Sequence, residues 1–196
     1  MRTLIFDTET TGMWNFKADL ADPDQPRPVQ ISALLYADSI EVAGINLLIN
    51  CQVPSHPKAL EVHRKTPELL RTCGLEELTA LAIFNNFARR ADRIVAHNIE
   101  FDKRIVQGMA LRNNLTHNAL ESTPLFCTMK TSTDVLRIPG RFGGFKWPKL
   151  IEAYKELVDP AGFADAHDAL ADTRACAAIL FALEDQGIML EEINRD

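Results

Sequence analysis

With 196 residues, 46% of them hydrophobic, the chain is long enough to bury the core of one domain. Its formal net charge of −6 excludes a global basic field, so nucleic-acid binding would depend on a local patch or on metal ions. No apolar run approaches the ~20 residues of a membrane span, and no signal peptide or lipidation motif is evident. The four cysteines lie singly, without zinc-site spacing. We therefore expect a cytoplasmic protein with reduced thiols and no membrane contact.

The first half of the chain predicts three strands and then helices. Apolar runs bounded by turn residues predict strands at 3–8, 29–36 and 41–50. An exposed loop rich in Pro and Asp, residues 17–28, separates the first two strands, and a short turn joins the second to the third. Residues 59–65 and 66–70 then resemble short helical pieces, and apolar residues at helical spacing predict a helix at 75–91.

The second half alternates strands with helices. Short apolar runs predict strands at 93–98 and 125–129. Helices are expected at 102–114, from about Pro148, and from Asp168 to Gln186, where Gly187 is a natural stop. Three early strands followed by this alternation indicate an α/β fold, with a mixed central five-stranded sheet flanked by helices.

The stretch LIFDTETTG, residues 4–12, places two carboxylates directly after a buried strand. Side chains of a strand alternate between faces, so Asp7 and Glu9 project the same way, about 6–7 Å apart along the chain. Burying two negative charges side by side costs several kcal/mol each unless something compensates them. The pattern therefore indicates a cation beside this strand.

Two further carboxylates begin the apolar stripes of predicted helices, because the residues at helical spacing after Asp102 and after Asp172 are apolar. Either aspartate alone would be explained as a helix N-cap or a partner of the helix dipole. Four carboxylates at the ends of elements, without a matching set of inward Lys or Arg, instead favour divalent cations. Oxygen ligands without cysteine favour Mg²⁺ or Mn²⁺, and two ions about 3.5–4 Å apart would suit phosphodiester chemistry.

His167 lies five residues before Asp172. On one helix the two side chains would be about 140° apart, so we expect His167 on the loop just ahead of the last helix. A single histidine is most simply a surface or packing residue. Beside a two-metal site, however, an imidazole is the natural base to deprotonate an attacking water.

These residues fall in segments that resemble the DnaQ-like, or DEDDh, 3′–5′ exonuclease superfamily, which has a ribonuclease H-like fold. FDTETTG resembles its first motif, HNIEFD its second, and HDALADTRA its third, with the HxxxxD spacing of the His subgroup. VQISALLY and EVHRKTPELL also resemble intervening segments, although the latter departs from the usual His-Gly. The resemblance covers nearly the whole chain and implies a single DEDDh exonuclease domain over residues 1–196.

The resemblance also implies a role for each side chain. It assigns the role of general base to His167. The ligands that it assigns to two Mg²⁺ or Mn²⁺ ions are Asp7, Glu9, Asp102 and Asp172. Family members seat the terminal nucleotide with backbone after the first motif and an apolar residue near the second. The candidates, for which turn chemistry and core packing are equally good explanations, are Thr10, Thr11, Gly12, Asn98 and Phe101. The expected reaction releases nucleoside 5′-monophosphates from 3′ ends of DNA, preferably single-stranded.

Other functions compete with this one. An exoribonuclease or oligoribonuclease would use the same two-metal site, because recognition of a 2′-OH can rest on one contact. An aspartyl-phosphate phosphatase is a distant alternative, because that chemistry needs an aspartate at position 9 in place of Glu9. A degenerate, non-catalytic relative would have lost at least one of the five motif residues, and all are present. The sequence does not decide whether a polymerase or a second copy of the chain is a partner.

The segment GRFGGFKW, residues 140–147, has two explanations. Its aromatic side chains, with Arg141 or Lys146, could stack on single-stranded substrate. Alternatively, it is a surface loop loosened by glycine, with aromatic side chains that pack back on the core. Trp14, just past the first motif, has the same two explanations.

Overall fold

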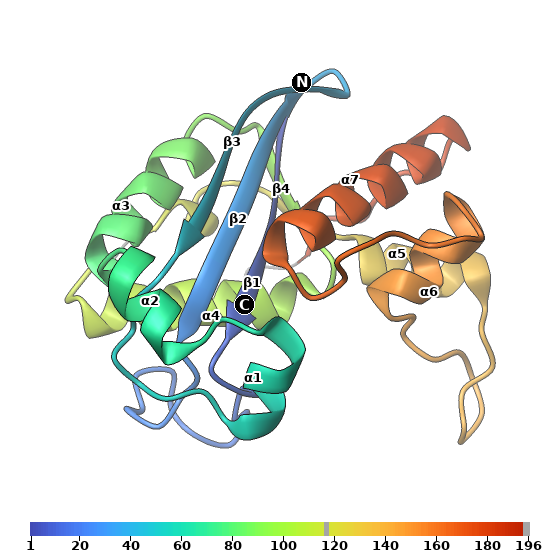
Figure 1. Ribbon diagram of the computed structural model, residues 1–196. Helices are drawn as coiled ribbons and strands as arrows, with labels where there is room; N and C mark the ends of the chain where they lie inside the picture. Colours follow the sequence, from blue (N-terminus) through green and yellow to red (C-terminus); the bar gives the residue numbers. More distant parts are fainter. Residues whose placement is uncertain (116–117, 194–196) are drawn as a thin grey trace.

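The computed structural model describes residues 1–115 and 118–193, which form a twisted sheet with helices on both faces (Figure 1). The strands are β1 (Arg2–Thr10), β2 (Pro28–Ala37), β3 (Ile40–Leu48), β4 (Arg93–Ala96) and β5 (Leu125–Cys127). Their order in the sheet is β3-β2-β1-β4-β5. The first three strands are antiparallel neighbours, whereas β4 and β5 run parallel to β1. The prediction of a mixed five-stranded sheet is confirmed.

The helices cover the two faces of the sheet in separate groups. They are α1 (Pro57–His63), α2 (Pro67–Cys73), α3 (Glu77–Ala88), α4 (Ile99–Arg112), α5 (Thr128–Leu136), α6 (Leu150–Leu157) and α7 (Ala169–Asp185), with a 3₁₀ turn at Ala119–Glu121. Leu4 and Phe6 of β1 pack with α3 and α4, whereas Ile5 packs with α6 and α7. Because strand side chains alternate, Asp7 and Glu9 share the face of Ile5 and point toward the α7 layer.

The boundaries of the five strands differ from the prediction by at most two residues, and two of these differences, in β1 and β5, bear on the site. β1 continues beyond the predicted range 3–8, because Glu9 and Thr10 remain paired with Gln30 and Pro28 of β2. The predicted strand at 125–129 ends at Cys127, and the next residue begins α5, a helix that the sequence pattern did not predict. The pattern missed this helix because two of its three buried residues, Thr128 and Ser132, are polar and do not count as apolar positions.

The helix boundaries also shift. The helix predicted from Asp102 begins at Ile99, so Asp102 lies in the first turn of α4 rather than at its start. The helix expected from about Pro148 begins at Leu150. For α7 the prediction is close: Asp168 caps the helix by accepting the N–H of Leu170, and Gly187 follows the helix with φ +75°. Within the described residues, no helix is both long and apolar enough to cross a membrane.

Candidate active site

The carboxyl end of β1 places Asp7 and Glu9 at the centre of the sheet, between β2 and β4. Both side chains are partly buried and face the layer that contains α7. Strand pairing with β2 holds the backbone of both residues, so their separation is set by the strand rather than by a flexible loop. Two carboxylates are therefore held side by side, as their spacing predicts.

The N-terminus of α7 brings a third carboxylate and the predicted histidine to the same place. Asp172 is buried in the first turn of the helix, and its two carboxylate oxygens accept the backbone N–H of His167 at 3.3 and 3.2 Å. His167 precedes the helix, as expected, and is exposed with φ +70°. Side-chain ligand atoms of Glu9, His167 and Asp172 lie within 4.8 Å of one another.

Asp102 reaches the site from the opposite layer of the molecule. It lies on α4 and is only 3% exposed. Its Oδ1 accepts two hydrogen bonds from Thr8, one from the backbone N–H at 3.0 Å and one from the hydroxyl at 2.6 Å. Thr8, which was not singled out in the sequence, therefore fixes the orientation of this carboxylate against β1.

The four carboxylates are close enough for their charges to shift one another's pKa values. Burial raises the pKa of Asp7 well above its usual range, and the charges of Asp102, Asp172 and Glu9 raise it further. Burial and Asp172 likewise raise the pKa of Glu9 to about 8. The pKa of Asp102 is raised to about 7 and that of Asp172 to about 6, in each case chiefly by burial. The cluster holds negative charge at a cost, and a cation would relieve it.

One basic side chain, missed in the sequence analysis, borders the cluster. The ammonium of Lys65 lies 2.7 Å from Oδ2 of Asp168, which also accepts the side-chain amide of Gln30 at 3.1 Å. Burial raises the pKa of Asp168, but the hydrogen bonds from Lys65 and Gln30 outweigh it and leave that pKa lowered. This network ties the start of α7 to β2. In the sequence, the only sign of this network was that the segment EVHRK departs from the usual His-Gly of the family. Arg64, at this place, adopts φ +57°.

A groove of about 930 Å³ opens beside Glu9 and contains four of the five predicted substrate-binding residues. They are Thr10, Thr11, Gly12 and Phe101. The hydroxyl of Thr10 donates to the carbonyl of Gly12 at 2.7 Å, and the hydroxyl of Thr11 accepts the N–H of Arg27 at 2.9 Å. These threonines therefore shape the turn that forms the groove. Asn98 lies outside the groove, where its left-handed conformation, φ +70°, turns the chain from β4 into α4.

Trp14 belongs to the core rather than to the groove. It is 5% exposed and packs beside Gly108 of α4, so the core-packing explanation of this residue is correct.

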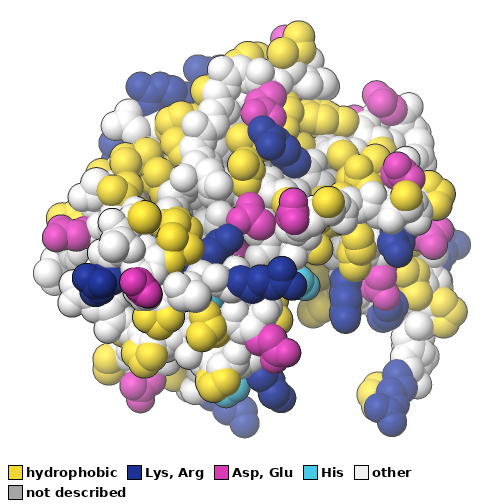
Figure 2. Space-filling view, viewed as in Figure 1, with side chains coloured by type: hydrophobic (Ala, Val, Ile, Leu, Met, Phe, Trp, Pro, Cys, Tyr) yellow, Lys and Arg dark blue, Asp and Glu magenta, His cyan; other side chains and the backbone are white. Residues whose placement is uncertain are grey.

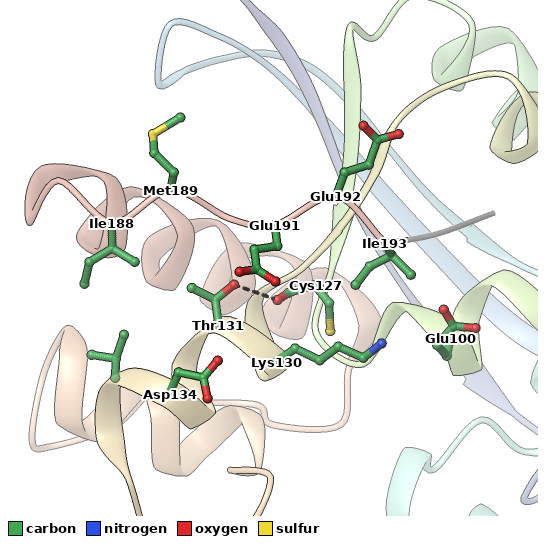
Figure 3. A pocket seen from close by; sticks show the side chains of 11 residues that line it. Glu100, Cys127, Lys130, Thr131, Asp134, Ile188, Met189, Glu191, Glu192 and Ile193 are labelled. Atoms are coloured by element: carbon green, nitrogen blue, oxygen red, sulfur yellow. Dashed lines mark hydrogen bonds between the residues drawn. The ribbon is translucent and has the colours of Figure 1, made fainter. Parts of the chain in front are cut away.

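A second cavity, of about 480 Å³, lies between α5 and the C-terminal segment (Figure 3). Its described lining includes Glu100, Lys130 and Glu191, with none of the predicted site residues.

Comparison with known proteins identifies the family. The RNase_T family model, described as Exonuclease, matches residues 4–180. An uncharacterised exonuclease, CP81 of Escherichia phage 186, is 27% identical over 188 residues, which are 94% of this chain and 89% of that protein.

Solved exonucleases share the fold. E. coli exonuclease I in complex with a dT13 oligonucleotide superposes with a TM-score of 0.74 at 17% identity, over 93% of this chain but only 41% of that one. Exonuclease X in complex with 5′ overhanging duplex DNA superposes with a TM-score of 0.66 at 22% identity, over 95% and 94% of the two chains. The predicted ribonuclease H-like fold and DnaQ-like resemblance are thus confirmed, and the phosphatase alternative is set aside. The chain belongs to the RNase_T exonuclease family.

Proposed function

We propose that this exonuclease is metal-dependent and removes nucleotides from the 3′ end of DNA, preferably single-stranded, releasing nucleoside 5′-monophosphates. The observation that carries the proposal is the convergence of Asp7, Glu9, Asp102 and Asp172 beside an exposed histidine at one end of the central strand. We further propose that residues 1–196 act as one catalytic domain.

The donor set fits hard divalent cations. It consists of carboxylate oxygens and one imidazole, and the ligand atoms of Glu9, His167 and Asp172 already lie within 4.8 Å of one another. Asp7, Glu9, Asp102 and Asp172 would hold two Mg²⁺ or Mn²⁺ ions. Such ions supply the positive charge that activates water and stabilises a departing 3′-oxygen. The raised pKa values of the four carboxylates are consistent with a site built to receive this charge.

The residues of the chain divide the remaining work. His167 is exposed at the edge of the cluster, where its ring can accept the proton of the attacking water. The groove beside Glu9 is large enough for a nucleotide, with Phe101 as an apolar contact and the turn of Thr10, Thr11 and Gly12 as polar wall. Lys65 and Asp168 hold the loop that carries His167.

DNA is the proposed substrate because two solved relatives of the same fold are complexes with DNA, one of them a single-stranded oligonucleotide. The direct test uses 5′-labelled single-stranded DNA, duplex DNA and RNA, each with Mg²⁺, Mn²⁺ or EDTA. We expect a ladder of shortened, still labelled products from single-stranded DNA with either metal and none with EDTA. Loss of the 5′ label as a mononucleotide would indicate cleavage from the 5′ end. Faster cleavage of RNA than of DNA would make RNA the preferred substrate.

Without divalent cations, the melting temperature is expected to fall as the pH rises from about 5 to about 8. Glu9, Asp102 and Asp172 have raised pKa values of about 8, 7 and 6 in the folded protein. The protonated forms of these carboxyl groups therefore stabilise the folded protein. This contribution is fully present below the pKa of about 4 in the unfolded chain, and it is lost as the pH rises through the pKa values of the folded protein. Calorimetry in EDTA at several pH values measures the effect.

Added Mg²⁺ or Mn²⁺ should raise the melting temperature most at the alkaline end of this range, because the ions bind ionised carboxylates. Asp172→Asn should flatten the pH profile measured in EDTA. The matched variant Asp165→Asn, which removes an exposed charge from the same loop, should leave it unchanged. If the metal ions raised the melting temperature equally at both ends of the pH range, the proposed metal site would be contradicted.

A further inference from the structure

Residues 137–147, hereafter the arm, project from the helical layer between α5 and α6 (Figure 1). The arm folds back on itself as a short hairpin. The N–H of Lys146 donates to the carbonyl of Ile138, and the N–H of Gly140 donates to the carbonyl of Gly144, both at 2.9 Å. Gly143 and Gly144 at the tip have φ +90° and +67°, a conformation that favours glycine. The arm is thus a defined element and not a loosened loop.

The aromatic side chains of the arm face solvent. Phe142 is 93% exposed, Trp147 66% and Phe145 51%. The idea that they pack back on the core, one of the two explanations of the sequence, is therefore wrong. Large exposed aromatic groups that lie close together on one projecting element are unfavourable in water and indicate a surface that binds something.

Positive charge accompanies these rings. The guanidinium of Arg141 lies 5.5 Å from the ring centre of Phe142, and that of Arg137 lies 5.9 Å from Phe145. Among the ion pairs of the described residues, Lys146 pairs with Glu152 at 2.5 Å, whereas neither arginine of the arm has an acidic partner. Arg137 donates through Nε to the carbonyl of Asp134 at 3.2 Å, which leaves its positive charge unneutralised. Within the described residues, the arm therefore presents two arginines without acidic partners beside aromatic faces, on a chain whose net charge is −6.

The base of the arm is fixed at the end of β4, the strand that pairs with β1. His97, which directly follows β4, is bonded through Nδ1 to the hydroxyl of Thr128 and through Nε2 to the carbonyl of Pro148, both at 3.0 Å. Burial lowers the pKa of His97 to about 4, so the ring stays neutral and bridges the two segments at physiological pH. The arm is therefore held in a fixed position relative to the carboxyl end of β4. The helix α4, which carries Asp102 in its first turn, begins shortly after this strand end.

The face that the arm borders is hollowed. Figure 2 shows a deep notch between the arm, with basic side chains (dark blue) at its tip, and the rest of the molecule. Figure 1, drawn from the same side, shows that the loop before α7 and the part of the molecule that carries α1 border this notch. A flexible polyanion with planar bases matches aromatic rings and arginines better than an acidic or apolar protein surface does, because stacking and charge are satisfied together.

We infer that the arm binds the single-stranded stretch of nucleic acid that lies 5′ of the terminal nucleotide in the active site. Phe142, Trp147 and Phe145 stack on bases, while Arg141 and Arg137 neutralise phosphates. This inference rests on the proposed function for the identity of the bound strand. It adds a second contact, made by residues other than the carboxylates, that makes binding depend on substrate length.

The test compares Phe142→Ala/Trp147→Ala with the wild type on three probes. They are the p-nitrophenyl ester of thymidine 5′-monophosphate, a dinucleotide, and an oligothymidylate of about 20 nucleotides. The variant should hydrolyse the ester and the dinucleotide at the wild-type rate. Its affinity for the long oligonucleotide, measured by fluorescence anisotropy in EDTA, should fall roughly ten- to hundredfold. Arg141→Ala should lower the slope of log affinity against log salt by about one.

Matched controls remove similar groups far from the arm. Ile40→Ala takes away an exposed apolar side chain at the β2–β3 hairpin, and Arg89→Ala an exposed arginine after α3. Both should bind the long oligonucleotide as the wild type does. Unchanged oligonucleotide affinity in the arm variant would overturn the inference, as would a shift in its oligomeric state without a change in that affinity. If the wild type hydrolyses none of the three probes, the proposed function fails instead.

Discussion

Asp7→Asn is expected to lower exonuclease activity at least about a thousandfold, because charge stabilisation at a metal-assisted phosphodiester transition state is worth several kcal/mol. Asp7 lies on the central strand, among the other three carboxylates of the cluster. Asparagine keeps the size of the side chain but removes the charge that would hold a divalent cation. The rate on a labelled single-stranded oligonucleotide, measured over a range of Mg²⁺ concentrations, gives the size of the loss.

The fold of this variant can be checked independently. Since burial and like charges raise the pKa of Asp7, removal of its charge should leave the metal-free melting temperature unchanged or higher at alkaline pH. Mg²⁺ should stabilise the wild type clearly and the variant little. Asp165→Asn, in the exposed loop before α7, should retain activity within about twofold. Near-native activity of Asp7→Asn would show that Asp7 is not a metal ligand.

His167→Asn should lower the rate roughly 10²–10⁴-fold, the usual contribution of a general base. Asparagine is the informative replacement, because His167 has φ +70° and asparagine tolerates this conformation better than alanine does. The backbone N–H that donates to Asp172 is retained, so the variant removes only the ring. Single-turnover kinetics with a labelled oligonucleotide measure the chemical step directly.

Metal dependence distinguishes a base from a ligand at this position. The His167 ring lies within 4.8 Å of ligand atoms of Glu9 and Asp172, so it is close enough to take either role. If His167 is the base, the Mg²⁺ concentration for half-maximal rate should stay within about twofold in His167→Asn. A rise of about tenfold or more would make it a ligand. A wild-type rate in the variant at every pH would remove His167 from the mechanism.

Local pattern predicted most of the elements. The strands at 29–36 and 93–98 and the long helix after Asp168 agree with β2, β4 and α7 to within about two residues, because apolar spacing alone specifies them. The helix α5 was missed because Thr128 and Met129 continue the strand predicted at 125–129, and because two of its three buried residues, Thr128 and Ser132, are polar. Its threonine hydroxyls are satisfied within the helix: that of Thr133, for example, donates to the carbonyl of Met129 at 2.9 Å.

The sequence by itself determined the five motif residues and the mixed sheet, since paired carboxylates after a strand and an aspartate on an apolar stripe are visible without coordinates. Only the tertiary structure decided how they meet. Asp102 and Asp172 come from opposite layers, and Thr8 holds the first of them in place. The Lys65–Asp168 pair and the exposed aromatic arm are contacts and surfaces between segments far apart in the chain. Short-range periodicity carries no information about such partners, because it reports only which face of an element is buried.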